Sequence, residues 1–125
     1  MDTVVHMLTL AVAANADGRA TFTPPDSGET WEIEKVTLTP NVDSAANGTN
    51  YVTLRPYKGT TALAAAQDTS STGLTQNTAV DFPVTATGAD KLITQANPMH
   101  FRVTKAGTGV LVNATVSVQF RRARV

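Results

Sequence analysis

The sequence predicts an all-β protein, an antiparallel β-sandwich of about eight strands. Apolar and polar residues alternate with a period of two along several segments, which is typical of strands with one buried face. Glycine, proline and asparagine turns separate these segments at intervals of about 8 to 15 residues. No stretch has the apolar spacing and length of a packed helix. We expect a jelly-roll order of strands, with an immunoglobulin-like sandwich as the alternative.

Length and composition are those of a single domain over residues 1–125. A chain of 125 residues buries enough surface to fold without disulfides, and it has no cysteine. Threonine (21) and alanine (18) are abundant, whereas charged residues make up only 16%. The isoelectric point of about 6.7 disfavours a general nucleic-acid binder. No apolar run approaches the roughly 18 residues of a membrane span, so we expect no membrane partner.

The first predicted strand covers residues 4–12. Its even-numbered residues form one face, which includes His6 and Leu10. An Ala14-Asn15-Ala16 sequence follows and is similar to a signal-peptide cleavage site. Because the segment starts with Asp2 and carries no Lys or Arg, we interpret it as a strand and expect no signal peptide. A turn at 15–18 leads to a short strand at 20–23, and prolines and glycine interrupt the chain at 24–28.

The strand predicted at residues 30–39 changes its buried face partway along. The apolar residues are Trp31, Ile33, Val36 and Leu38, so the alternation shifts by one position. A bulge near Glu34 and Lys35 would produce this shift. The next strand, 49–57, is expected to end or to lie at a sheet edge at Pro56, which has no N–H to donate.

The second half of the chain begins with an ambiguous segment. Residues 60–78 are interpreted as a loop over a short edge strand, with one helical turn at 62–67 as the alternative. Short strands are expected at 79–82 and 91–94. Two clear strands, 99–104 and 110–120, are joined by a glycine-containing loop at 105–109. The last strand has the clearest alternation, with Val110, Val112, Ala114, Val116, Val118 and Phe120 on one face.

Residues with catalytic or metal-binding chemistry are sparse. His6 and His100 each lie within a strand pattern without a neighbouring ligand motif, so we interpret them as ordinary strand residues. Glu32 and Glu34 share a strand face at a spacing of about 6.6 Å, but they are more simply a solvent face than a glycosidase pair. No serine lies in a G-x-S-x-G motif. We therefore expect no enzymatic activity, no catalytic residues, no metal and no cofactor.

The formal net charge of zero conceals an asymmetry along the chain. Residues 1–90 hold all ten acids and four bases, a net charge of −6, whereas 91–125 hold six bases and no acid. The basic end, residues 121–125, contains Arg121, Arg122 and Arg124. These arginines are either a solvated chain end that protects a sheet edge, or an arm that pairs with acidic groups of another subunit. Nucleic-acid binding is the weakest interpretation, because no aromatic residues are interleaved with the arginines.

Two tyrosines complete the set of candidate contact residues. Five of the seven aromatic residues fall on apparent core faces, which leaves Tyr51 and Tyr57. They could stack on a sugar, but a tyrosine at a strand edge more often packs or lies in a subunit interface. We therefore list Arg121, Arg122, Arg124, Tyr51 and Tyr57 as candidate protein–protein contacts.

Three segments resemble small β-sandwich proteins of tailed-phage virions, and most closely jelly-roll capsid decoration (cement) proteins. They are the string from Glu29 to Leu38, the turn from Tyr57 to Thr61, and the basic final strand from Val116 to Arg122. The resemblance is a general one that extends over the whole chain, and no single motif carries it. It implies a dimer or trimer of identical subunits, bound to the major capsid protein on the outside of a phage head. The protein would be made in the host cytoplasm and reside in the virion.

Other functions fit a compact β domain as well. The main alternative is a receptor-binding module of a phage tail fibre or baseplate, or a carbohydrate-binding module. A tail-tube or head–tail connector subunit is a third class, and an enzyme is the last.

Overall fold

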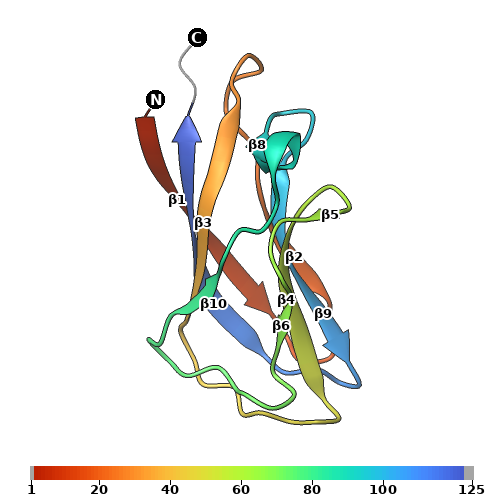
Figure 1. Ribbon diagram of the computed structural model, residues 1–125. Coiled ribbons are helices and arrows are strands. Elements are labelled where there is room, and N and C mark those ends of the chain that lie inside the picture. Colours follow the sequence, from red (N-terminus) through yellow and green to blue (C-terminus); the bar gives the residue numbers. More distant parts are fainter. Residues whose placement is uncertain (1, 123–125) are drawn as a thin grey trace.

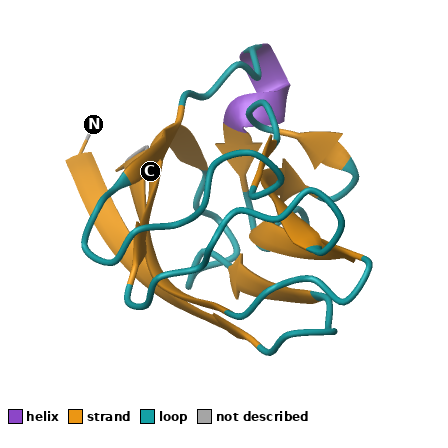
Figure 2. Cartoon of the chain, turned by 90° about the horizontal axis from the view of Figure 1, so that it is seen from below, coloured by secondary structure: helices purple, strands orange, loops and turns teal. Residues whose placement is uncertain are grey.

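The computed structural model describes residues 2–122, and these form a two-layered β-sandwich (Figure 1). In chain order the elements are β1 (Asp2–Val12), β2 (Gly18–Phe22), β3 (Trp31–Pro40), β4 (Tyr51–Lys58), β5 (Thr61–Ala62), β6 (Gln67–Asp68), β7 (Val80–Phe82), the 3-10 helix η1 (Gly88–Lys91), β8 (Leu92–Ile93), β9 (Met99–Ala106) and β10 (Val112–Arg122). Loops and η1 surround the two layers (Figure 2). The structure thus confirms the predicted all-β sandwich.

The strand order is that of a jelly roll. One sheet, sheet A, has the order β1-β10-β3-β7, with β8 also paired to β3; the other, sheet B, has the order β2-β9-β4-β5, with β6 also paired to β4. All pairs are antiparallel. The first strand pairs with the last and not with the second, so the immunoglobulin alternative is wrong.

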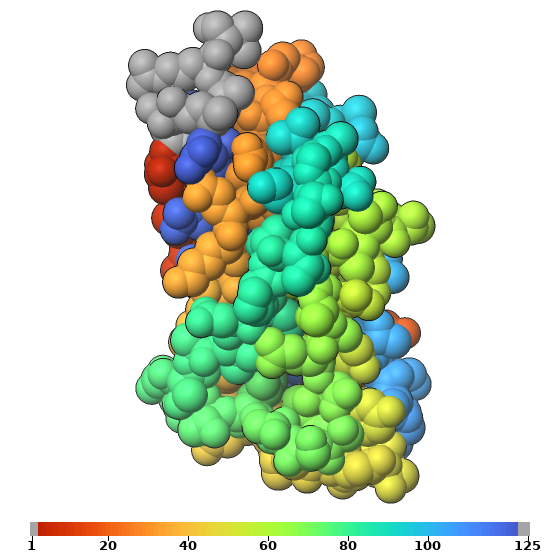
Figure 3. Space-filling model, in the orientation of Figure 1, coloured from red at the N-terminus to blue at the C-terminus, as the bar shows by residue number. Residues whose placement is uncertain are grey.

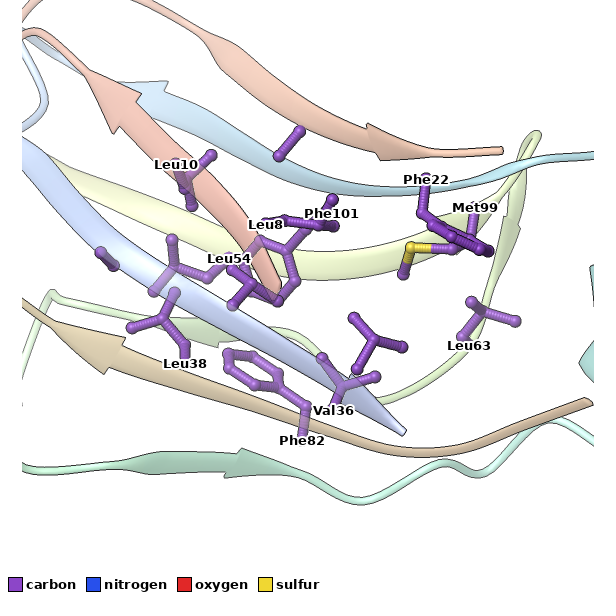
Figure 4. Close-up of a cluster of buried hydrophobic side chains, with 14 of the residues drawn as sticks. Leu8, Leu10, Phe22, Val36, Leu38, Leu54, Leu63, Phe82, Met99 and Phe101 are labelled. Atoms are coloured by element: carbon purple, nitrogen blue, oxygen red, sulfur yellow. The ribbon is translucent and has the colours of Figure 1, made fainter. Parts of the chain in front are cut away.

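The core fills the space between the sheets and follows the period-two pattern. Sheet A contributes Leu38 and Phe82, and sheet B contributes Leu54 and Phe101, all fully buried (Figure 4). Phe82 and Phe101 meet edge to face across the layers with ring centroids 5.1 Å apart. A second aromatic cluster lies near one end of the sandwich, where Phe22, Trp31 and Phe120 contact one another. Both sheets therefore close over one continuous hydrophobic cluster.

The predicted bulge in β3 is present at Glu34. Lys35 pairs with Gln119 and Ile33 pairs with Phe120, so Glu34 has no partner on β10. The extra residue moves the buried set from odd-numbered to even-numbered positions, which keeps both halves of β3 facing the core. This arrangement confirms the register change read from the sequence.

Pro56 lies inside β4 and does not end it, so the first of the two expectations is wrong. The strand continues to Lys58, and Pro56 pairs with Phe101 on β9. The Pro56 carbonyl accepts a hydrogen bond from the Leu63 N–H on the other side of the strand. The proline nitrogen points the same way as its carbonyl, between the short pairings of β4 with β5 and β6, so its missing N–H costs β4 no bond to β9.

The two lateral sides of the sandwich differ. On one side, residues 59–98 run over the gap between β3 and β4 and close it (Figure 3). β6 pairs with sheet B and β7 with sheet A, and Leu63 and Leu74 are buried beneath. Residues 62–67 hold strand and loop in place of the alternative helical turn. On the opposite side, β1 and β2 are the outermost strands of their sheets. In the part of the chain that the structure describes, no helix has the length and apolarity to cross a membrane.

Candidate functional site

Arg121 and Arg122, the two C-terminal arginines that the structure describes, lie on β10 against β3. Arg121 Nε is 3.2 Å from the buried Oε1 of Glu34, the bulge residue. Arg122 lies 3.8 Å from Glu29 and over the ring of Trp31. Arg124, the third arginine of the predicted contact set, lies outside the described residues.

These pairings join the acidic and basic parts of the sequence in space. Glu32, on β3, also has a cationic partner, because Lys91 Nζ is 3.1 Å from its Oε1. A shallow hollow holds both carboxylate–cation pairs, those of Glu32 and Glu34. The sequence asymmetry therefore does not make this end of the molecule a basic pole. The carboxylates of Glu32 and Glu34 are engaged with cations, and residues 2–122 contain no cluster of three or more potential metal ligands.

The outer edge of β1 is a candidate assembly surface. Within residues 2–122, β1 pairs only with β10 and forms the end of sheet A. Val5 and Met7 point away from the core with 57% and 60% of their surface exposed, and Leu111 on the same face of the sheet is 49% exposed. These are the large hydrophobic residues that the described part of the chain leaves exposed. Edge strands of soluble proteins usually carry Lys, Pro or bulges, and residues 3–12 contain neither Lys nor Pro.

The two candidate tyrosines do not form a common surface. Tyr51 and Tyr57 lie at opposite ends of the eight-residue strand β4. The Tyr57 ring stacks on His100, with centroids 5.5 Å apart and planes 14° apart, and Arg102 lies 4.3 Å from its centroid. Tyr57 thus supports two neighbouring side chains, which leaves it poorly placed to stack on a sugar.

The outer face of sheet B carries three arginines side by side. Arg19 on β2 is directly opposite Arg102 on β9, which is directly opposite Arg55 on β4. We call these three residues the arginine row. On one side of the row lie Thr21, His100 and Tyr57, again in cross-strand register.

Each member of the arginine row has a different local setting. Arg102 donates from its guanidinium to Nε2 of His100 at 3.0 Å and lies over the Tyr57 ring. Arg55 donates from Nε to the Ala64 carbonyl at 2.7 Å. Arg19 is exposed on the edge strand β2.

His100 lies beneath this face and is only 6% exposed. Burial lowers the pKa of its ring, and the charges of Arg102 and Arg19 lower it further. The ring is therefore neutral at pH 7, and its Nε2 accepts the hydrogen bond from Arg102. His100 does lie on the polar face of β9, as predicted, but it is enclosed there by Tyr57 and Arg102.

Sequence reasoning found the basic chain end and missed the arginine row. Arg19, Arg55 and Arg102 are far apart in the sequence and each occupies the polar face of its strand. A shared row requires the pairing partners and their register, which alternation within single strands does not specify. The signal that was available is that all three strands carry arginine on the polar face.

Comparisons with known proteins give the following result. A scan against protein-family models finds no match, and a search of curated proteins finds none either. Among solved structures, the fold is similar to a chain in the structure of the Gx strain of infectious bursal disease virus, with 13% sequence identity and a TM-score of 0.33. The match covers 94% of the present chain and 32% of the viral one, so the chain spans about a third of the length of that protein.

Proposed function

We propose that the protein is a structural subunit, a decoration protein that binds the outer surface of a phage head and stabilises the shell by non-covalent contacts. The observation that carries this proposal is the unprotected edge of β1, an eleven-residue strand with Val5 and Met7 exposed. Exposed apolar side chains on a bare sheet edge are typical of surfaces that are covered by another protein.

The shape of β1 favours a second copy of the chain as one occupant of this edge. Met7 is the middle residue of Asp2–Val12, so a full antiparallel overlap of two copies places Met7 opposite Met7 of the second copy. Val5 then lies opposite Thr9, and Thr3 opposite Ala11, without like charges in register. The pairing is self-complementary and closes as a dimer.

Two further features support the capsid as the partner of the assembled subunits. The jelly roll is a fold used in viral capsids, although it also occurs in lectins and cupins and does not specify a function alone. The resemblance to cement proteins runs through β3, the turn after β4, and β10, which lie in both sheets. In this proposal the protein is made in the host cytoplasm and binds the major capsid protein.

The test is to mix the purified protein with undecorated phage shells. The proposal expects the protein to sediment with the shells, and the decorated shells to survive heating to a higher temperature than bare shells. Shells of the phage that encodes the protein are the sample, and shells of an unrelated phage are the control. A protein that stays in the supernatant, or that leaves the heat resistance of the shells unchanged, contradicts the proposal.

The alternative is a receptor-binding or carbohydrate-binding module, with its ligand on the outer face of sheet B. The contacts of the Tyr57 ring with His100 and Arg102 weigh against sugar stacking there. A glycan array separates the two functions, because a decoration protein binds no glycan selectively.

A further inference from the structure

We propose that Arg19, Arg55 and Arg102 form a binding site for a compact oxyanion, the chemistry shared by phosphate, sulfate and carboxylate groups. The site lies on the outer face of sheet B and does not involve the edge of β1. The anion site goes beyond the proposed assembly role, and its test is independent of the test of that role.

The charge of the arginine row is not compensated by a neighbouring carboxylate. Like charges directly opposite one another on a sheet destabilise it, so three arginines in register cost stability in the absence of an anion. Among residues 2–122, the ion pairs of the chain involve Lys91, Arg121 and Arg122, and no carboxylate lies within ion-pair distance of the arginine row. An anion bound between the guanidinium groups removes this repulsion.

The arginine row has hydrogen-bond donors that are available and partly held in place. A guanidinium has five N–H donors. Arg55 donates a hydrogen bond from Nε to the Ala64 carbonyl, and Arg102 donates one from its guanidinium to His100. The centroid of the Tyr57 ring lies 4.3 Å from the guanidinium carbon of Arg102 and 5.9 Å from that of Arg55, so both groups lie near one ring. The remaining N–H donors of these guanidinium groups suit bidentate contacts with oxyanions.

The surroundings limit the size of the ligand. Adjacent strands lie about 4.8 Å apart, so a row across three strands spans roughly 10 Å. Next to the row, Thr53 pairs with Asp68, and the carboxylate of Asp17 accepts a hydrogen bond from the Lys105 N–H at 2.7 Å. Asp17 and Asp68 are both exposed and would repel a long polyanion that continued across this face.

A hollow between β2 and β9 provides space beside the row. Arg19, Arg102 and Thr104 line it, together with Gly18. Asp17 also lines the hollow and limits its affinity for anions. The balance of two arginines against one carboxylate favours a ligand with one or two negative charges.

His100 couples anion binding to pH. The groups that face it are Arg102 on its own strand, Arg19 on β2, and Tyr57 and Arg55 on β4. An anion among the arginines offsets the positive charges that help to lower the pKa of His100, and so raises that pKa. Between the pKa values of the free and bound states the complex holds more protons than the free protein. Anion affinity therefore increases as the pH falls through this interval.

The experiment is a titration of the full chain with sodium sulfate, sodium phosphate and glutarate at constant ionic strength, followed by NMR. We expect saturable shifts of β2, β4 and β9 amides and a higher pKa of His100 in the saturated sample. Arg19→Gln should weaken binding about tenfold, as expected for the loss of charge-assisted hydrogen bonds. This variant leaves the fold intact, because Arg19 is exposed on an edge strand.

Lys35→Gln is the matched control, because it removes one exposed charge from the outer face of the other sheet and should leave the affinity unchanged. Selective binding of glutarate identifies a carboxylate source, and selective binding of sulfate or phosphate identifies a tetrahedral oxyanion. The proposal is overturned if no compact anion gives saturable shifts, or if Arg19→Gln and Lys35→Gln weaken binding equally. Tighter binding of a long oligonucleotide that Arg19→Gln leaves unchanged also overturns it.

Discussion

The closest backbone approach to a glycine occurs at Gly73. Ser44 and Leu74 exchange two backbone hydrogen bonds of 2.8 Å, which brings the chain at 44–46 directly over Gly73. A methyl group on Gly73 would overlap the Ser44 carbonyl oxygen and lie 2.9 Å from the Ala46 nitrogen. Both neighbours are backbone atoms, so neither can rotate away.

Gly73→Ala should therefore lower the free energy of unfolding by about 1–3 kcal/mol, the usual cost of overpacking. The measurement is urea denaturation followed by tryptophan fluorescence, since Trp31 lies in the core. Gly48→Ala is the control, because no atom lies within 4 Å of a methyl group at that position. Its unfolding free energy should change by less than about 0.5 kcal/mol. Equal effects of the two substitutions would contradict this account of Gly73.

Individual residues show which parts of the core the period-two alternation of the sequence can predict. It identified the inward faces of β3 and β10 and the aromatic core residues, because burial of alternate residues is a property of one strand. It failed to show that His100 is buried, because its cover comes from Tyr57 on another strand. Local patterns thus predict a core more completely than the contacts on an outer face.

The edge of β1 leads to a prediction about oligomeric state. We expect the protein to be a dimer in solution, and we expect Met7→Lys to make it a monomer. The substitution places a charge opposite the same charge of the second copy at the centre of the pairing. The fold should tolerate the change, since the Met7 side chain is 60% exposed. Light scattering after size exclusion measures the mass.

Thr61→Lys is the control for this prediction. Thr61 is exposed on β5, at the end of sheet B, so it adds the same charge far from β1 in the sheet order. This variant should keep the mass of the wild type. A monomeric wild type, or a Met7→Lys variant that remains a dimer, would show that β1 is not the interface.

The sequence predicted most of the strands but not the arginine row that the strands bring together. The elements themselves were largely predictable, including the Glu34 bulge, because each has a signal within one segment. The placement of Pro56 within β4 was not predictable, because it depends on the gap between β5 and β6. The arginine row likewise exists only through the register of β2 and β4 on β9. Cross-strand register is set by packing of the whole sandwich and is weakly encoded in any one strand.

At the scale of the whole molecule, the jelly-roll topology brings the two ends of the chain together. β1 pairs with β10 over its full length, and the basic end of β10 lies against β3 (Figure 1). Arg121 therefore meets Glu34 of β3, Arg122 meets Glu29 just before β3, and these opposite charges of the two parts of the sequence cancel locally. The three cations of the arginine row, which have no ion-pair partner among residues 2–122, lie on the other sheet.

The same topology predicts that stability depends on protein concentration. Residues 59–98 close one side of the sandwich, whereas on the other side β1 pairs only with β10 among residues 2–122. Dimerisation through β1 stabilises only the folded state, so by mass action the Tm of the wild type should rise with protein concentration. Met7→Lys should show a Tm that is independent of concentration, and it should match the wild type at the lowest concentration. Differential scanning calorimetry over a wide dilution series measures both. If the wild-type Tm does not change on dilution while its mass changes from dimer to monomer, the interface contributes nothing to folding and β1 is stable as a bare edge.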